Sequence, residues 1–244
     1  MVVRSAEGAV VVVDAGPDPR LVDGCLARLG VGMVDAVVLT HDHADHVDGL
    51  PGVLDGRTVG RVLTTPLDAP PVQAADVVRE AAARQVPVDH LYAGDQLSWP
   101  GIRARVWWPA RIIHAGSEPN NASLVLSVEV DGVRLLLLGD VEREAAAEVL
   151  RGMRADPAVL STGFDVLKVA HHGSSNRDDE LYAAVTAPLA VISVGEGNDY
   201  GHPAPSTVAL LERDGFRVLR TDHDGDIAVV GERGRVGAAT ARGG

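Results

Sequence analysis

The sequence has few of the residues that mark disulfide-bonded or membrane-spanning proteins. Cys25 is the single cysteine among 244 residues, which excludes an intrachain disulfide and leaves the redox compartment open. The longest apolar runs, such as residues 133–138, are far shorter than the roughly 20 residues that span a bilayer. Nothing at the N-terminus resembles a signal peptide. The sequence therefore predicts a soluble chain.

Basic and aromatic side chains are scarce too. The chain has 22 Lys and Arg against 34 Asp and Glu, a net charge of −12, whereas nucleic-acid-binding domains tend to be basic. Aromatic residues make up 3%, and the tryptophans are expected to pack in the core or at its rim rather than to stack on bases. A local basic patch that could offset the charge consists of Arg103, Arg105, Arg111 and Lys168.

Short apolar runs alternate with helical patterns along the chain. Residues 9–16 read as a buried strand and residues 18–30 as a helix, with Asp18 as N-cap and Gly30 as stop. Residues 123–140 read as a hairpin around Asp131-Gly132. Further strands are predicted at 34–39, 101–108, 164–169, 189–194, 216–220 and 226–230, and further helices at 75–86, 141–152, 178–187 and 206–214.

This order of elements predicts a mixed α/β (α+β) fold, with two mixed sheets and helices outside them. The length suits one large domain, which we place at residues 1–232. The Gly-rich segment 233–244 is expected to be a flexible tail.

The segment THDHADHVDGL at residues 40–50 concentrates possible metal ligands directly after the apolar run VDAVVL. His41, His43, Asp45 and His46 lie so close together in the chain that a turn lets them converge on two neighbouring points. Imidazole and carboxylate are ligands that zinc and related cations prefer. The alternative is a solvated polar loop. The spacing favours a metal site.

Other segments repeat this arrangement of a strand followed by a possible ligand. Asp140 ends the run LLLLGD, His171 and His172 follow DVLKVA, and His202 follows VISV. Asp140 is expected to bridge two cations with its carboxylate. Its alternative role is the N-cap of the next helix. All of these residues are expected to meet at one edge, because loops on a rigid scaffold carry function.

The pattern His-x-His-x-Asp-His after an apolar strand, then Gly-Asp, then a late histidine, resembles the metallo-β-lactamase superfamily over nearly the whole chain. The segments NNASLVLSVEVDGVRLLLLGDVE, DVLKVAHHGSSN and VISVGEGNDYGHP resemble the C-terminal domain of the ComEC family, the DNA-uptake channel of natural competence. In that family a strand with a Gly-Gln-Gly-Asp segment usually comes before the point where this chain starts. The comparison suggests an excised domain or a shortened gene, with the first strand truncated.

The resemblance implies a four-layer αββα sandwich with two divalent metal ions, zinc or manganese. By this resemblance His41 and His43 hold the first ion, Asp45 and His46 the second, Asp140 bridges them, and His202 completes the second site. His171 is a further ligand or a proton donor to the leaving group. His172 is a second candidate donor and also a possible ligand or a residue that supports the ligands. Asp14 is expected to orient ligand histidines, with a strand-end turn residue as the alternative.

One departure concerns a histidine that many superfamily hydrolases have shortly before the Gly-Asp hairpin. Asn120 or Asn121 stands near that place, and we take Asn121 as the possible ligand. Amide oxygen suits manganese better than zinc, so the first site is expected to be weak or manganese-selective.

The function predicted from the residues and the resemblance is metal-dependent hydrolysis of a phosphodiester. Asp45 would orient the attacking hydroxide and His171 would act as acid. Ser174 and Ser175 would bind phosphate, or would simply cap the next helix. The resemblance implies a nuclease that degrades the non-transported DNA strand. Single-stranded DNA and the channel of a parent protein would be its partners.

The same resemblance places the parent protein in the plasma membrane, with this domain on the extracytoplasmic side. The oligomeric state stays open. Two alternatives to the nuclease remain: a hydrolase of a small ester, lactone or cyclic phosphate, and a non-catalytic, metal-stabilised DNA-binding or assembly module.

Overall fold

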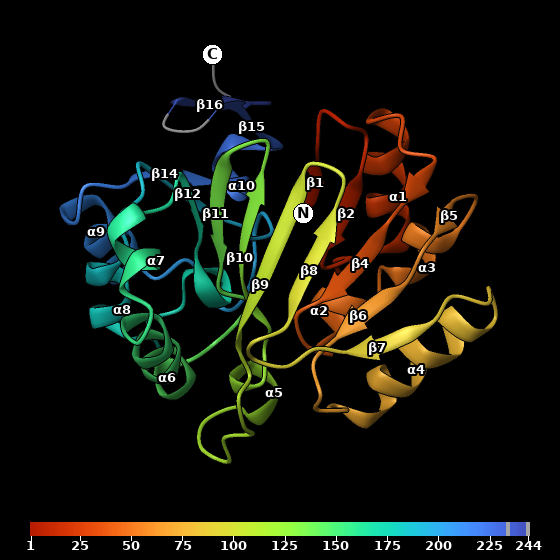
Figure 1. The fold of residues 1–244 in the computed structure, drawn as a ribbon, viewed down its shortest axis with the longest axis horizontal. Coiled ribbons are helices and arrows are strands. Elements are labelled where there is room, and N and C mark those ends of the chain that lie inside the picture. The colour runs from red at the N-terminus through yellow and green to blue at the C-terminus, as the bar shows by residue number, and fades with distance from the viewer. Residues whose placement is uncertain (233–234, 243–244) are drawn as a thin grey trace.

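Two β-sheets face each other in the computed structural model, which describes residues 1–232 and 235–242 (Figure 1). The first sheet has the order β1-β2-β4-β6-β7, and the second has the order β14-β13-β12-β11-β10-β9-β8. The strands of the first sheet are β1 (Val2–Arg4), β2 (Val10–Val13), β4 (Ala36–Leu39), β6 (Val62–Thr64) and β7 (Val88–His90). Those of the second are β8 (Gln96–Trp99), β9 (Ile102–Trp108), β10 (Val125–Val130), β11 (Val133–Leu137), β12 (Val166–Lys168), β13 (Leu189–Ile192) and β14 (Arg217–Arg220).

Helices cover the outer face of each sheet (Figure 1). The first sheet is covered by α1 (Pro19–Arg28), α3 (Leu50–Leu54) and α4 (Pro71–Ala82). The second is covered by α6 (Arg143–Arg154), α7 (Pro157–Thr162), α8 (Asp179–Ala184) and α9 (Pro205–Arg213). The expected four-layer αββα sandwich is therefore confirmed.

Shorter elements lie between these layers. They are α2 (Ala44–Val47), α5 (Glu118–Asn121), α10 (Thr221–Asp224) and a 3-10 turn at Ala170–Gly173. Two small ribbons pair β3 (Met33–Val34) with β5 (Thr58–Val59), and β15 (Ile227–Glu232) with β16 (Arg235–Thr240). None of the helices in the described ranges is long and apolar enough to cross a membrane.

The continuous apolar runs of the sequence are explained by burial on both faces of each sheet. In β2, Val10 and Val12 pack under the helices, whereas Val11 and Val13 face the opposite sheet. In β11, Leu136 points to the outer helices while its neighbours point inward. Successive side chains of a strand alternate between faces, so a strand covered on both sides needs no polar positions.

Most predicted elements agree with the structure. The helix expected at 75–86 is α4, which spans Pro71–Ala82, and α3, α7 and several short strands were not predicted. Asp18 caps α1 by accepting a hydrogen bond from the Arg20 amide at 2.8 Å, as expected. Strands β6, β7 and β8 were not predicted because they have three or four residues and β7 is largely exposed. The segment expected as a flexible tail contains β16, which pairs in register with β15. Residues 233–234 and 243–244 of that expected tail lie outside the described part.

The strand directions gather the candidate residues at one end of the sandwich. β2, β4 and β6 run parallel to one another, and so do β11, β12, β13 and β14. The loops after these strands leave from the end of the sheets where α2 and α5 lie (Figure 1). In open sheets of this kind the carboxyl ends of the strands carry the ligand site.

Two leucines of α1 test the layer packing. Leu26 is fully buried under the first sheet, whereas Leu21 on the same helix is 69% exposed. We expect Leu26→Ala to lower the free energy of unfolding by about 2–5 kcal/mol, because a cavity replaces packed atoms. The matched Leu21→Ala change should stay within about 0.5 kcal/mol. Urea denaturation of both variants measures the difference, and equal effects would contradict the packing described.

Candidate metal centre

The loop after β4 brings three histidines together at the end of the first sheet. His41 and His46 are buried, at 0% and 3% exposure, and their ring centroids lie 4.2 Å apart. His43 Nδ1 lies 3.0 Å from His41 Nε2. Burial, followed by the neighbouring His46, lowers the pKa of His41 to about 3. His41 is therefore neutral near pH 7, which is the form that binds a metal ion.

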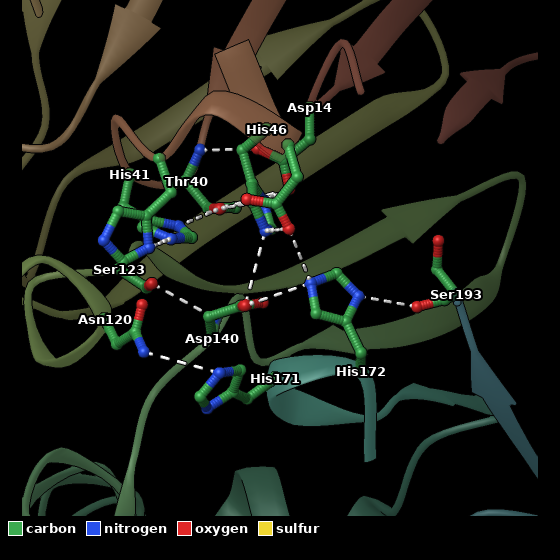
Figure 2. Close-up of polar contacts among 12 residues, drawn as sticks. Asp14, Thr40, His41, His46, Asn120, Ser123, Asp140, His171, His172 and Ser193 are labelled. Carbon is green, nitrogen blue, oxygen red and sulfur yellow. Dashed lines mark hydrogen bonds and ion pairs between the residues drawn. The ribbon is translucent and has the colours of Figure 1, made fainter. Parts of the chain in front are cut away.

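Asp14, directly after β2, orients the His46 ring (Figure 2). Its carboxylate accepts hydrogen bonds from the Thr40 amide at 2.7 Å and from His46 Nδ1 at 2.9 Å. Burial alone would raise the pKa of Asp14, but the His46 ring outweighs it and the net shift is downward. With Nδ1 held by Asp14, Nε2 of His46 faces the opposite sheet. A carboxylate on the far nitrogen of a histidine can orient it as a metal ligand, and this role of Asp14 stays a prediction.

Asp140 reaches the centre from the second sheet, just after β11. Gly139 before it has φ +54°, and a Cβ there would lie 2.8 Å from Ser123 Cβ, so no larger residue fits without a shift. Ser123 Oγ accepts a hydrogen bond from the Asp140 amide at 3.1 Å. The Asp140 carboxylate is buried, with Oδ2 3.3 Å from His46 Nε2. The Gly-Asp pair thus places one buried carboxylate against the histidines of the other sheet.

His172 closes the centre from the turn after β12. Its Nδ1 donates to the Ser193 carbonyl at 2.7 Å, so Nε2 points at Asp140 Oδ2 and Asp45 Oδ2, 3.2 and 3.1 Å away (Figure 2). Burial lowers the pKa of His172, but the two carboxylates outweigh it and raise the value to about 9. His171 and His172 both have left-handed backbone, with φ of +46° and +51°. Such strained backbone clusters at functional sites.

Two overlapping groups of ligand atoms result. One group is His41, His46 and Asp140, and the other is Asp45, His46 and His172; within each, the ligand atoms lie within 4.8 Å of one another. His46 Nε2 and Asp140 Oδ1 are buried and make no hydrogen bond. A buried polar atom without a partner is costly, and a cation between these atoms would satisfy them. Imidazole nitrogens with carboxylate oxygens therefore fit a divalent metal such as zinc.

The remaining predicted histidines lie beside these groups rather than in them. His171 and His202 have ring centroids 5.4 Å apart, and neither belongs to a ligand group. His43 contacts His41 but is likewise outside both groups. The place that the resemblance assigned to His202, next to Asp45 and His46, is taken by His172.

The two asparagines have different surroundings. Asn121 Oδ1 accepts hydrogen bonds from the Glu142 and Ala145 amides at 3.1 and 3.4 Å, so this side chain caps the start of α6. Asn120 faces the histidines, with Nδ2 3.5 Å from His171 Nε2, and its buried Oδ1 has no partner. The amide next to the centre is therefore Asn120, not Asn121.

Glu142 is a site residue that sequence reasoning missed. It is 6% exposed, accepts hydrogen bonds from the Ser117 amide and Asn120 Nδ2 at 2.9 and 3.2 Å, and lies 3.9 Å from His171 Nδ1. Its position two residues after Asp140, in GDVE, was the available signal. The Ser193 carbonyl that orients His172 belongs to the backbone, so side-chain patterns carry no signal for it.

Ser174 and the four residues of the basic patch make other contacts within the chain, whereas Ser175 is exposed. Ser174 Oγ accepts a hydrogen bond from the Asn176 amide at 3.1 Å, while Asp178 caps α8; Ser175 is exposed. The cations of the patch have partners as well. Arg103 pairs with Glu129, Arg105 with Asp156 and Arg111 with Glu148, and Lys168 donates to the Val169 carbonyl. No unpaired basic surface results from these four residues.

Comparison with known proteins agrees with this geometry. Residues 1–195 match the family described as the metallo-beta-lactamase superfamily. The chain belongs to this superfamily. Zinc-bound PqqB from Methylobacterium extorquens, a solved structure with a TM-score of 0.60, is 17% identical and covers 90% of this chain and 84% of its own. At that identity the likeness concerns the fold.

Two curated relatives of this superfamily member are competence-related proteins. ComE operon protein 3 of Bacillus subtilis (strain 168) is 34% identical over 203 residues, which are 83% of this chain and 25% of that protein. Competence protein ComA of Neisseria gonorrhoeae is 27% identical over 236 residues, 96% of this chain and 30% of that protein. The chain thus spans a quarter to about a third of the length of these relatives.

The raised pKa of His172 predicts how the metal-free protein responds to pH. Because the folded-state pKa of about 9 exceeds the ordinary 6.5, protonation stabilises the fold fully below pH 6.5. This contribution is lost as the pH rises through 9. Thermal unfolding in the presence of a chelator should therefore show a falling Tm between pH 6.5 and 9. In His172→Gln the fall should be smaller, and a Tm that rises in the wild type would contradict the geometry.

The contact between Asp14 and His46 predicts an effect on metal affinity. Asp14→Asn keeps the shape but weakens the hold on the ring, and partners of ligand histidines typically contribute about 10- to 100-fold in affinity. Titration with zinc or manganese, followed by calorimetry, measures the loss. Asp18→Asn, which alters the cap of α1 outside the centre, is the control. Unchanged affinity in Asp14→Asn would exclude an orienting role.

Proposed function

We propose that this chain hydrolyses phosphodiester bonds in single-stranded DNA, using zinc or manganese ions. The observation that carries the proposal is the environment of Asp140 Oδ2. Nε2 of His46 and Nε2 of His172, from loops of opposite sheets, lie 3.3 and 3.2 Å from this one oxygen. A carboxylate shared in this way suits a bridging ligand in a two-metal centre.

The two overlapping groups would hold the ions, with His41, His46 and Asp140 on the buried side and Asp45 and His172 on the open side. When bound, the ions supply Lewis-acid polarisation of a phosphoryl oxygen and activation of water. The carboxylate of Asp140, which lies within 3.3 Å of both His46 Nε2 and His172 Nε2, is the group that supports two ions rather than one.

Two side chains of this chain would position the attacking water and protonate the leaving group. Asp45 has a side chain 53% exposed at the rim, within reach of both the centre and solvent, so it orients the attacking water. The ring of His171, 23% exposed and centred 6.3 Å from His172, delivers a proton to the leaving oxygen. Glu142 and Asn120 flank this ring on its buried side, 3.9 and 3.5 Å from its nitrogens.

The DNA substrate is supported by the relatives named for competence and by the ComEC-like motifs. Those relatives are three to four times as long as the matched region. We infer that such a domain acts within a membrane-bound DNA-uptake protein, on its extracytoplasmic side, and degrades the non-transported strand. Because the three arginines of the expected patch are paired with acids and Lys168 donates to a backbone carbonyl, we infer that the centre itself attracts the phosphate.

Removing Asp140 tests the proposal directly. Asp140→Ala deletes the shared carboxylate, so cleavage of a fluorescent single-stranded oligonucleotide by the metal-loaded protein should fall by about 100-fold or more, the scale of single electrostatic groups in catalysis. Asp226→Asn is the matched control, because Asp226 has an 80% exposed side chain that pairs with Arg28.

Two outcomes would reject this function. Equal cleavage by wild type and Asp140→Ala would identify a contaminating nuclease. Turnover of lactones with no cleavage of any phosphodiester would assign the centre to small esters.

A further inference from the structure

One aromatic side chain beside the metal centre is left open to solvent. Tyr200, in the loop between β13 and α9, is 86% exposed, the highest value among the exposed large apolar or aromatic side chains of the described residues. Its ring stacks on His202, with centroids 6.4 Å apart and an interplanar angle of 17°. An aromatic ring held in this way at the rim of a site offers a surface for stacking.

The loop that carries Tyr200 is held by its own side chains. Asn198 Nδ2 donates to the His202 carbonyl at 2.7 Å, and Asn198 Oδ1 accepts from the His202 amide at 3.2 Å. At the other end of the loop, Arg242 donates to Glu196 Oε2 at 2.8 Å. The Tyr200 ring is therefore presented by a closed loop, and little order has to be gained when a ligand stacks on it.

A series of rings connects Tyr200 with the metal centre. The His202 ring lies 5.4 Å from His171, and His171 lies 6.3 Å from His172, whose Nε2 faces Asp45 and Asp140. A strand whose phosphate lies at the centre would thus bring one of its other nucleotides to Tyr200.

The charge next to the ring disfavours phosphate as its ligand. Asp199 precedes Tyr200, and the charge of Glu196 on the same loop is balanced by its ion pair with Arg242. Nucleobases are neutral, and every base has a π-face that an aromatic side chain can contact. Stacking recognises single strands without sequence preference, which suits a chain with a net charge of −12.

We propose that Tyr200 is a base-stacking residue, on which a nucleobase of a bound single strand packs next to the phosphodiester at the metal centre. The inference rests on the proposed function and extends it, because it says what distinguishes a nucleic-acid strand from other phosphodiesters. It also predicts a contact that persists when salt screens the phosphates.

The experiment compares wild type, Tyr200→Ala and Tyr200→Phe on two fluorescent strands. One strand is oligothymidylate and the other is an abasic deoxyribose-phosphate strand of the same length. Fluorescence anisotropy gives the Kd of each strand, and steady-state cleavage by the metal-loaded protein gives KM and kcat. Tyr92→Ala is the matched control, because Tyr92 is an exposed tyrosine, at 53%, that follows the edge strand of the first sheet.

We expect Tyr200→Ala to raise the Kd and the KM for oligothymidylate about tenfold, within the range of single base–aromatic stacks. The abasic strand should bind equally to all variants, and Tyr200→Phe should behave as wild type because the ring remains. The ratio of Kd values between Tyr200→Ala and wild type should be the same at low and high salt.

The outcomes separate this inference from the proposed function. Cleavage of both strands with equal constants in wild type and Tyr200→Ala would overturn the stacking role and leave the nuclease standing. Base-dependent binding through Tyr200 without any cleavage would support stacking and reject the nuclease. A loss that is equal on the abasic strand would reject stacking, since it would show a role in folding of the loop.

Discussion

The buried carboxylate of Asp140 is the group on which the rest of the centre depends. A carboxylate 2% exposed is costly unless charge or hydrogen bonds compensate it. Compensation comes from His46 and His172, and each of these rings is turned toward Asp140 by an acceptor on its far nitrogen. Asp14 holds His46 and the Ser193 carbonyl holds His172. Burial lowers the pKa of each ring, but the neighbouring carboxylates outweigh it and raise the pKa of both His46 and His172, so a divalent cation that binds here would compete with protons.

The centre also lies on the seam between the two sheets. His46 and Asp14 come after strands of the first sheet, whereas Asp140 and His172 come after strands of the second. Backbone contacts join the same loops, because the Leu124 amide donates to the Thr40 carbonyl at 2.8 Å. A cation bound here would therefore tie the two halves of the sandwich together, and metal affinity and fold stability would be coupled.

The predictability of this protein from its sequence depends on how far each feature is set by local pattern. The strands that are buried on both faces could be predicted, because each is a continuous apolar run in the sequence. His41, His46 and Asp140 were proposed as ligands because each comes soon after such a run. Which of His171, His172 and His202 faces the carboxylates of the centre could not be predicted from the sequence. Left-handed backbone at both consecutive histidines decides which ring turns inward, and periodicity contains no information on that. The roles of these residues in catalysis stay predictions.

Many superfamily hydrolases have a histidine shortly before the Gly-Asp hairpin, where this chain has Asn120 and Asn121. The structure gives these two asparagines different roles. Asn121 satisfies two amides at the start of α6, the helix that begins three residues after Asp140, so it fixes where the shared carboxylate stands. Asn120 lies in the position next to the centre, between Glu142 and His171, with its carbonyl oxygen unpartnered. Neither asparagine belongs to the two ligand groups around Asp140. Asn120 Nδ2 and Glu142 Oε1 lie 3.5 and 3.9 Å from the nitrogens of the His171 ring, so an amide and a carboxylate flank this ring on its buried side. The expectation of a weak or manganese-selective first site stays a prediction.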